Sequence, residues 1–374
     1  MKTNIQVYFY GLQYGEQLKR HINTKNTVSH AIHKFNRNLV EALQVNYKVK
    51  IISPVYTSQK IIAKEHCENI EYEYIKYHGY MGRIRLMCSS FFKTLRGREK
   101  IIIADALNIS MTYGIVRARR YTHDKVVLIV TDIPDDVLHG KKTIYAKIFI
   151  KNLKEADGLI FLTEQANKDY NYNKVPFCII EGIAREQKIV PYPTEKKISV
   201  YAGGLLNKYY VRQLVDAFDS IAKENEVLYI FGDGEDKEYI EKKSKESKNI
   251  EYMGNVNNEI VLRYEETAEL LINPRPDIGE YTKYSFPSKL IEYMTSGTPA
   301  LVNKLQGVPE IYYDRLYLFS GYDMNSYKES LRKVLDIPRG EKKGLGEKAK
   351  SFILERNGID AVARKLEKMI NRMI

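Results

Sequence analysis

The chain has 374 residues, of which 44% are hydrophobic and 28% charged, and its net charge is +12. This length is too great for one typical core and predicts two domains, while no apolar run is long enough to span a bilayer. The N-terminus begins with a strand-like segment instead of a signal peptide, and the three cysteines are too few and too scattered for a disulfide framework or a zinc site. These features predict a cytosolic protein.

The positive charge is distributed unevenly. Residues 1–195 hold 30 of the 59 Lys and Arg but only 19 of the 47 Asp and Glu, so an excess of +11 belongs to this half. Such asymmetry predicts that one domain faces an anionic partner, either a membrane surface or nucleic acid. A general basic bias without a partner is the alternative.

Short apolar runs alternate with amphipathic stretches in the first half. Five runs are expected to be buried parallel strands: 5–10, 49–52, 101–104, 126–130 and 158–162. Two of the helical stretches between them, 80–98 and 141–154, are basic and amphipathic, and the first places Ile84, Cys88, Phe91, Phe92 and Leu95 on one face. Basic amphipathic helices lie in the headgroup layer of anionic membranes, although a core-facing helix with a solvated basic side is the alternative.

A second series of strands follows a proline-marked linker at 190–193. Its expected strands are 198–202, 227–231, 250–253, 270–273, 299–302 and 316–319, with helices between them. The segment 348–374 fits one or two helices with a single buried face. The chain is therefore expected to contain two Rossmann-like α/β domains.

The stretch 285–299 combines a turn, a helix start and a carboxylate. Pro287 fixes its own φ, Ser288 is expected to cap a helix over 289–296, and Gly297 and Pro299 end that helix. The free amides of a helix N-terminus attract phosphate, and Glu292 lies one turn further on, where it can accept hydrogen bonds from ribose hydroxyls. An ordinary capped helix with a solvated glutamate is the alternative.

Glycine turns follow three of the expected strands in the second half. Gly203 and Gly204 would let backbone amides approach a phosphate, and Lys208 would add a point charge. The turn Phe231-Gly-Asp-Gly lacks the third glycine of a dinucleotide fingerprint, so a tight turn is favoured over NAD binding. Gly254, the third turn, would let a flat base lie against the main chain.

Acidic residues follow strands in the first half. Asp132 comes directly after the strand 126–130, where it could orient or deprotonate an acceptor hydroxyl or cap the next helix. Asp105 and Glu164 occupy the corresponding positions after two other strands, and either could lie near the sugar.

Five segments occur in the order seen in retaining GT-B glycosyltransferases: Tyr201-Ala-Gly-Gly, Phe231-Gly-Asp-Gly, Tyr252-Met-Gly-Asn-Val256, Ile272-Asn-Pro274 and the stretch 286–299. The chain resembles glycosyltransferase family 4, especially the bacterial members that build capsular, O-antigen or exopolysaccharide repeats. The resemblance implies an α/β fold of GT-B type, with two Rossmann-like domains facing across a cleft. Residues 1–190 would bind the acceptor, 191–355 the nucleotide sugar, and a helix over 356–374 would cross back to the first domain.

The resemblance also implies roles for particular residues. Glu292 would hold the donor ribose. The diphosphate would lie by Gly203, Gly204, Lys208 and the amides around Pro287 and Ser288, with Lys289 or Arg275 as helper cations, and the segment Gly254, Asn255 and Val256 would contact the base. Asp132 and Lys208 are the residues expected to take part in catalysis. One departure is Tyr284, which stands where the family's Glu-x7-Glu motif has the glutamate that contacts the transferred sugar.

Together these observations predict a metal-independent glycosyltransferase of hexosyltransferase type, because an Asp-x-Asp metal motif is absent and no His/Cys/Asp cluster has ligand spacing. The expected donor is a UDP-sugar, no cofactor is expected, and the expected acceptor is a glycan or a lipid-linked oligosaccharide. The expected location is cytoplasmic, at the inner face of the cell membrane. Two alternatives stay open: a non-catalytic glycosyltransferase-like partner subunit, suggested by Tyr284, and a nucleic-acid-binding α/β protein, which lacks any recognised binding motif.

Overall fold

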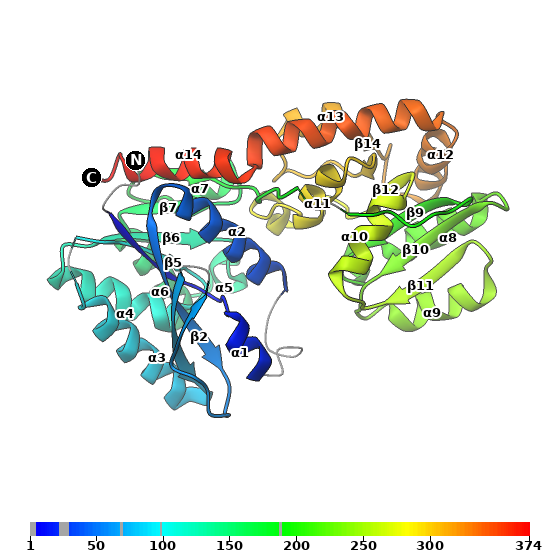
Figure 1. Ribbon diagram of the computed structural model, residues 1–374. Coiled ribbons are helices and arrows are strands. Elements are labelled where there is room, and N and C mark those ends of the chain that lie inside the picture. Colours follow the sequence, from blue (N-terminus) through cyan, green and yellow to red (C-terminus); the bar gives the residue numbers. More distant parts are fainter. Residues whose placement is uncertain (1–4, 22–29, 68–69, 98, 187–188) are drawn as a thin grey trace. The chain divides into compact units, whose positions relative to one another are not determined.

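A computed structural model describes residues 5–21, 30–67, 70–97, 99–186 and 189–374. Position 98, at the end of the basic stretch 80–98, lies outside the described residues. The chain forms two compact units, which Figure 1 shows. Unit 1 contains Met1–Ile183, Lys283–Phe286 and Asn357–Ile374, and unit 2 contains Ala184–Thr282 and Pro287–Arg356. The chain thus leaves unit 1 after Ile183 rather than at 190, and the short segment Lys283–Phe286 belongs to unit 1.

Unit 1 is built on a sheet in the order β3-β4-β2-β1-β5-β6-β7-β8. Its strands are β1 (Gln6–Tyr10), β2 (Lys48–Tyr56), β3 (Lys64–Cys67), β4 (Ile70–Tyr77), β5 (Ile101–Asp105), β6 (Lys125–Val130), β7 (Gly158–Phe161) and β8 (Phe177–Ile179). Neighbouring strands are parallel except β3 and β4, which are antiparallel. The helices of unit 1 are α1 (Glu16–His21), α2 (His30–Asn46), α3 (Gly79–Thr94), α4 (Ile109–Ala118), α5 (Asp135–Leu138), α6 (Ile144–Glu155), α7 (Glu164–Tyr170) and α14 (Ile359–Ile370).

The strand order of unit 1 reverses between β1 and β5. The chain first builds β2, β3 and β4 on one side of β1 and then returns to build β5 to β8 on the other side. In open parallel sheets of this kind, ligands bind at the carboxyl ends of the strands where the order reverses. Gly11 follows β1 at this point, and Asp105 ends β5.

Helices cover both faces of the sheet in unit 1. One core contains side chains of α2 and α14, such as Leu39 and Leu366, and the other contains side chains of α3, α4 and α6, such as Leu86 and Phe149. α14 is tied to the body of unit 1 through the buried carboxylate of Glu181. Lys365 Nζ of α14 lies 3.5 Å from Glu181 Oε2, and Asn357 Nδ2, just before α14, donates to the same oxygen at 3.3 Å.

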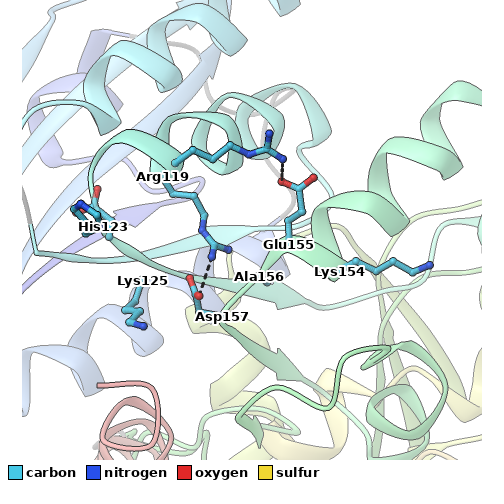
Figure 2. A pocket seen from close by; sticks show the side chains of 9 residues that line it. Arg119, His123, Lys125, Lys154, Glu155, Ala156 and Asp157 are labelled. Carbon is cyan, nitrogen blue, oxygen red and sulfur yellow. Dashed lines mark hydrogen bonds and ion pairs between the residues drawn. The ribbon is translucent and has the colours of Figure 1, made fainter.

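An open hollow of about 720 Å³ lies at the amino ends of β6 and β7 (Figure 2). Two ion pairs line it, one between Arg119 and Asp157 at 3.0 Å and one between Arg120 and Glu155 at 2.9 Å. These pairs neutralise much of the charge in the hollow. Because ligands of parallel α/β sheets bind at the carboxyl ends of the strands, this opposite edge is not the expected place for the chemistry.

Unit 2 is a parallel sheet in the order β11-β10-β9-β12-β13-β14. Its strands are β9 (Lys197–Ala202), β10 (Glu226–Phe231), β11 (Ile250–Gly254), β12 (Leu270–Asn273), β13 (Ala300–Val302) and β14 (Tyr317–Leu318). Its helices are α8 (Val211–Ile221), α9 (Lys237–Glu246), α10 (Asn258–Thr267), α11 (Ser288–Ser296), α12 (Met324–Leu335) and α13 (Arg339–Asn357), whose last residue already belongs to unit 1. Its core joins α8 and α12 to the sheet, with Phe218 and Leu331 fully buried.

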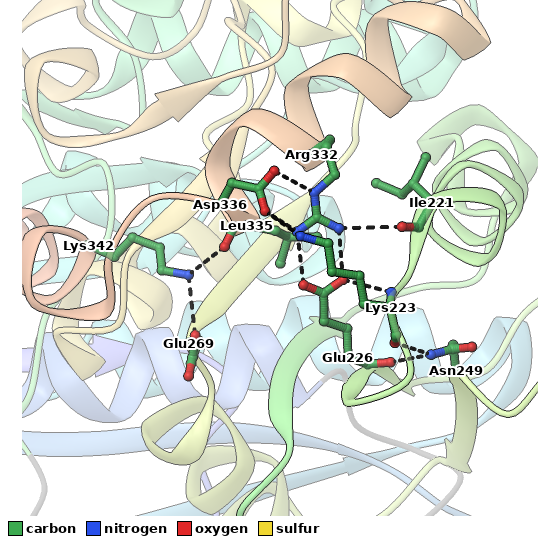
Figure 3. Close-up of polar contacts among 9 residues, drawn as sticks. All are labelled: Ile221, Lys223, Glu226, Asn249, Glu269, Arg332, Leu335, Asp336 and Lys342. Carbon is green, nitrogen blue, oxygen red and sulfur yellow. Dashed lines mark hydrogen bonds and ion pairs between the residues drawn. The ribbon is translucent and has the colours of Figure 1, made fainter.

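An ion-pair network around the buried Glu226 lies at the amino end of β10 (Figure 3). Glu226 is fully buried and accepts two hydrogen bonds of 2.9 Å from the guanidinium of Arg332, which also pairs with Asp336. Burial would raise the pKa of Glu226, but the hydrogen bonds from Arg332 and from the Lys223 amide outweigh it, so the pKa lies below its usual value. The network therefore anchors α12 to the sheet.

None of the helices in the described part of the chain has both the length and the apolarity needed to cross a lipid bilayer. The three cysteines are free thiols, with Cys178 buried, Cys67 partly buried and Cys88 exposed on α3.

Candidate active site

The strand order of unit 2 reverses between β9 and β12. These strands pair only at Ser199 with Leu270 and at Val200 with Leu271, and they separate toward their carboxyl ends. The hydroxyl of Tyr293, on α11, accepts a hydrogen bond from the amide of Ala202 at 3.0 Å and lies 3.5 Å from the carbonyl oxygen of Ile272. α11 is thereby fixed behind the point where a ligand is expected in such a sheet.

The glycine turns at this edge are interlocked through their backbones. Gly203 N donates to the carbonyl of Phe231 at 3.0 Å, and Gly232 N donates to the carbonyl of Gly254 at 3.0 Å. A Cβ at Gly232 would lie 1.8 Å from the carbonyl oxygen of Gly203, so only glycine fits there. The glycine at 232 is therefore required by the close packing of two turns. This fits the expected tight turn and not a dinucleotide site.

The two glycines after β9 differ in what their amides can do. The amide of Gly203 is already used by Phe231, whereas the amide of Gly204 makes no hydrogen bond to any described residue. The carbonyl of Gly204 is held by the hydroxyl of Tyr201 at 2.7 Å, and no atom comes closer than 3.5 Å to a Cβ built at Gly204. Of the two amides expected to face a phosphate, only that of Gly204 is therefore available to do so.

Two cations lie together beyond β9 and β12. Lys208 is exposed, and its ammonium lies 5.1 Å from the centre of the Tyr281 ring. The guanidinium of Arg275, which follows β12, lies 5.0 Å from the same ring, and both cations also lie within 5.6 Å of the Tyr209 ring. Aromatic faces hold cations in place without neutralising their charge. The arrangement therefore presents two positive charges at the reversal point.

α11 starts one residue earlier than expected. Pro287 is the N-cap, Ser288 is the first helical residue, and the cap makes no side-chain hydrogen bond. The expectation that Ser288 caps the helix is wrong, because the restricted backbone of Pro287 ends the preceding segment directly before it. Ser288 is exposed. The amide of Leu290 donates to the carbonyl of Pro287 at 2.9 Å, so the amides of Ser288 and Lys289 are the ones without a helical acceptor. The helix ends at Gly297, whose φ is +81°.

Glu292 is held by the neighbouring lysine. Lys289 Nζ lies 2.5 Å from Glu292 Oε2 and 3.4 Å from Oε1 of the fully buried Glu265. Burial would lower the pKa of Lys289, but the two carboxylates outweigh it and raise the pKa above its usual value. Lys289 thus lies between two carboxylates, which does not match its expected role as a helper cation for the diphosphate. It orients Glu292 instead.

The expected base-contacting segment lies at the end of β11. Gly254 has a φ of +73°, and a Cβ there would meet no atom within 4 Å, so backbone conformation and not crowding favours glycine. Asn255 is exposed and Val256 partly buried.

A small cavity lies next to the start of α11. It is lined by Asn273, Arg275, Pro287, Leu290, Val302, Asn303, Leu305, Val308 and Tyr313. Its space for the centre of a water molecule is only about 10 Å³. The cavity holds about one water and is too small for a sugar.

In unit 1 the residues expected on the acceptor side lie at the carboxyl ends of β5 and β6. Asp132 is exposed, and its carboxylate accepts the amide of Ile133 at 2.9 Å. Asp105 lies at the reversal point itself and accepts the amide of Leu107 at 3.0 Å. Burial raises the pKa of Asp105 to about 6. A carboxyl group that titrates near neutral pH is suited to accept a proton.

Tyr284 belongs to unit 1. Its hydroxyl donates to Asp169 Oδ2 at 2.9 Å, and its ring packs edge-on against Tyr170 at 5.3 Å. Thr163 Oγ1 donates to the carbonyl of Lys283 at 3.0 Å and holds the same segment. Tyr284 is therefore used as an anchor of the segment Lys283–Phe286.

The residues expected at the donor all lie in unit 2, in the segments after β9, β11 and β12 and at or in α11. Asp132 lies in unit 1. From the sequence, Arg275 was expected only as a possible helper cation, and no role was expected for Tyr281 or Tyr293. The position of Arg275 directly after β12 was a usable signal, because β12 is where the strand order returns. For Tyr293 no local signal existed, since its role depends on two strands that are distant in sequence.

Comparisons with known proteins agree with this architecture. The family model of glycosyl transferases group 1 matches residues 183–371. No curated protein sequence matches the chain. The chain is similar in structure to a sucrose-phosphate synthase from Thermosynechococcus elongatus, with 14% identity, 99% of each chain covered and a TM-score of 0.74.

Two further solved structures are similar to the chain. One is the trehalose-6-phosphate structure from E. coli bound with UDP-2-fluoro glucose, with 9% identity, 98% of each chain covered and a TM-score of 0.72. The other is an alpha,alpha-trehalose-phosphate synthase from Burkholderia xenovorans in complex with glucose-6-phosphate, with 10% identity, 98% of this chain and 100% of that chain covered, and a TM-score of 0.71. At such identities the likeness shows the fold, and the family match shows the rest: the protein belongs to the glycosyl transferases group 1 family and is a glycosyltransferase with the GT-B fold.

Proposed function

We propose that the protein transfers a sugar from a nucleoside diphosphate donor, a UDP-sugar, to a hydroxyl group of a lipid-linked glycan in the synthesis of a bacterial surface polysaccharide. The transfer retains the anomeric configuration and uses neither a metal ion nor a cofactor. The protein works at the inner face of the cell membrane. The family resemblance supports retention and the class of pathway, the nucleoside diphosphate donor rests on the site, and the location at the membrane rests on the excess positive charge of the first half of the chain.

The observation that carries the proposal is the arrangement at the reversal point of unit 2. Lys208 and Arg275 converge on the ring of Tyr281, the amide of Gly204 is open, and α11 presents its uncapped start with Glu292 one turn behind. Cations and helix amides suit a diphosphate, and a carboxylate beside them suits the two hydroxyls of a ribose. Few ligands other than a nucleoside diphosphate combine these groups.

The same groups would also promote the reaction. The bond between the anomeric carbon and the diphosphate oxygen breaks, the acceptor oxygen forms the new bond, and the acceptor proton passes to a base. Negative charge grows on the leaving diphosphate, where Lys208 and Arg275 stabilise it more strongly than in the ground state. Each donor removed should cost roughly 3 kcal/mol, or about a hundredfold in rate.

On the acceptor side, Asp132 is the expected partner of the acceptor hydroxyl, and Asp105, at the end of β5 where the strand order reverses, is a second candidate base, whose pKa burial raises to about 6. The neighbouring synthases include one solved with glucose-6-phosphate, which makes a sugar phosphate the competing acceptor. Carboxylates at the ends of β5 and β6 would repel a phosphate. An acceptor whose reacting end is an uncharged sugar fits these strand ends better.

The test is made with the purified full-length protein. A thermal-shift screen of nucleosides, nucleoside diphosphates and nucleotide sugars identifies the donor, because a ligand of the folded state raises the melting temperature by mass action. Donor consumption is then measured with lipid-linked sugars and, separately, with hexose phosphates. Transfer to the lipid-linked sugar alone supports the proposal, and transfer to a hexose phosphate overturns the acceptor assignment. Binding without hydrolysis or transfer favours a non-catalytic subunit, and no nucleotide binding overturns the donor site.

A further inference from the structure

α3 has its large apolar side chains on the outside. Two lines of residues, each one helical turn apart, run along this helix. The buried line contains Gly82, Leu86, Ser90 and Thr94, and the exposed side carries Tyr80, Met81, Ile84, Cys88, Phe92 and Leu95. We call these six exposed residues the α3 face. The exposed fractions of Tyr80, Met81 and Phe92 are 77%, 73% and 62%.

The packing of α3 against α4 explains this orientation. A Cβ at Gly114 of α4 would lie 2.2 Å from the carbonyl oxygen of Met87 and 3.1 Å from the amide of Phe91. The two helix backbones are therefore almost in contact at Gly114, where no side chain larger than that of glycine fits between them. Phe92 and its neighbours on the α3 face have no space on the inner side, so they point away from the core of unit 1.

Several cations accompany the α3 face. Arg83 and Arg85 are exposed on α3, and Arg96 follows the helix with 69% of its side chain exposed, 3.6 Å from Glu73. α3 itself contains no Asp or Glu. A further exposed aromatic ring, that of Tyr121, continues the surface and lies 6.2 Å from the ring of Phe91.

We propose that the α3 face is a docking surface for an anionic lipid bilayer, into which Tyr80, Ile84 and Phe92 insert at headgroup depth while Arg83 and Arg85 contact lipid phosphates. This inference rests on the part of the proposed function that places the protein at the membrane and names the surface that makes the contact, but it does not depend on the donor or on the reaction. Aromatic and aliphatic side chains mixed with arginine are typical of helices that lie in the membrane interface. The excess positive charge of the first half of the chain adds to the attraction.

Charge argues against the two other possible occupants. In a symmetric dimer the α3 face would meet itself, and the arginines would face arginines without a carboxylate on the helix to pair with them. The centre of a typical protein–protein interface is depleted of charged residues, whereas Arg83 and Arg85 flank Ile84 directly. An anionic partner with a soft apolar interior satisfies both kinds of side chain.

The test uses the full-length protein and vesicles of phosphatidylcholine, either alone or with about 30 mol % phosphatidylglycerol, since anionic lipid attracts basic residues near the surface. Co-sedimentation should occur with the anionic vesicles and fall steeply with salt. The double substitution Ile84→Ser/Phe92→Ser should weaken binding at least about tenfold, as should Arg83→Gln/Arg85→Gln. The controls are Ile311→Ser, which removes an exposed apolar side chain from unit 2, and Lys343→Gln/Lys348→Gln, which removes two charges from α13.

A second measurement does not depend on the substitutions. An environment-sensitive fluorophore on Cys88, in a Cys67→Ser background, should shift its emission to the blue with anionic vesicles, because Cys88 lies on the α3 face. Equal binding to phosphatidylcholine alone, unchanged binding of both double variants or an unshifted fluorophore overturns the proposal. A solution mass that doubles and returns to one chain in Ile84→Ser/Phe92→Ser overturns it in favour of self-association. Nucleotide-induced thermal shifts in the same variants show separately whether the donor site is intact.

Discussion

The substitution Glu292→Gln separates the donor site from the stability of the fold. It keeps the size and one hydrogen-bonding oxygen of the side chain but removes its charge. In the structure the carboxylate is largely buried, with 14% of the side chain exposed, and it is oriented by Lys289. If this carboxylate accepts the ribose hydroxyls of the donor, the substitution removes charge-assisted hydrogen bonds in the complex.

The expected loss of binding is larger than the expected loss of stability. Hydrogen bonds to a charged group contribute about 1.5–3 kcal/mol. Their loss should raise the dissociation constant of the nucleoside diphosphate roughly 10- to 150-fold. Lys289 keeps its second partner, Glu265, after the substitution. The free energy of unfolding should therefore fall by no more than about 1 kcal/mol, since the glutamine oxygen can still accept a hydrogen bond from Lys289 on the same helix.

The assay is isothermal titration calorimetry with the nucleoside diphosphate and with the free nucleoside, together with thermal unfolding without ligand. The control is Glu241→Gln, which removes a carboxylate 3.8 Å from Lys237 on α9 and should leave binding unchanged. Nucleoside and nucleoside diphosphate should weaken by the same factor, because both carry the ribose. Unchanged affinity in a folded Glu292→Gln protein would refute the assignment of the ribose to α11.

Three further predictions follow from other parts of the molecule. Lys208→Met should weaken the nucleoside diphosphate roughly tenfold or more but leave the free nucleoside unaffected, as measured by the same titrations, because Lys208 is assigned to the diphosphate alone. Asp105→Asn should raise the free energy of unfolding at pH 8 by up to about 3 kcal/mol and change it little at pH 4, while transfer activity falls. Its folded-state pKa of about 6 lies above the unfolded value of 3.8, so the stability that the protonated group contributes is lost as pH rises through 6. Arg332→Met should cost about 3–5 kcal/mol in chemical denaturation at pH 7, because it leaves Glu226 buried without its partner, and less at acid pH, where Glu226 is protonated.

The sequence was sufficient for most of the fold because the central strands of both sheets are continuous apolar runs. β5 and β6 lie between helices on both faces, so nearly every residue in them is apolar and the run is easy to find. β3 and β4 were not predicted, because their sequence alternates Glu, Lys and Tyr at the edge of the sheet. The glutamates of β4 are held by lysines from neighbouring elements, such as Lys50 with Glu71 at 2.7 Å, which a single-sequence reading does not find.

The proposed donor site could be suggested from the sequence because its signals are local. A proline, a helix start and a glutamate one turn later lie within a few residues of each other, and their relation follows from helix geometry. The interaction partners of those residues could not be predicted from the sequence. Lys289 was expected to face the diphosphate, but whether a lysine faces a ligand or a buried carboxylate depends on Glu265, which comes from another helix.

The orientation of α3 is a further case in which tertiary contact decides. The sequence placed apolar and basic residues on this helix but left open whether the apolar side faces the core. Gly114 of α4 settles the question, because the absence of a side chain there brings the two backbones together and leaves no room for Phe92 or Ile84 on the inner side.

Tyr284 stands where the resemblance implies a sugar-contacting glutamate, and in the structure its side chain makes other contacts. A glutamate at this position would place a carboxylate beside Asp169, and the two like charges would repel, whereas the tyrosine hydroxyl donates to Asp169 and its ring packs on Tyr170. The segment Lys283–Phe286 is thereby held in unit 1, although the next residue, Pro287, is the N-cap of α11 in unit 2. A side chain held in this way cannot also contact the transferred sugar without breaking its hydrogen bond to Asp169. The choice of sugar in this protein must therefore rest on residues other than position 284, and the exposed start of α11 with the Lys208 and Arg275 pair is the part of unit 2 in which to seek them.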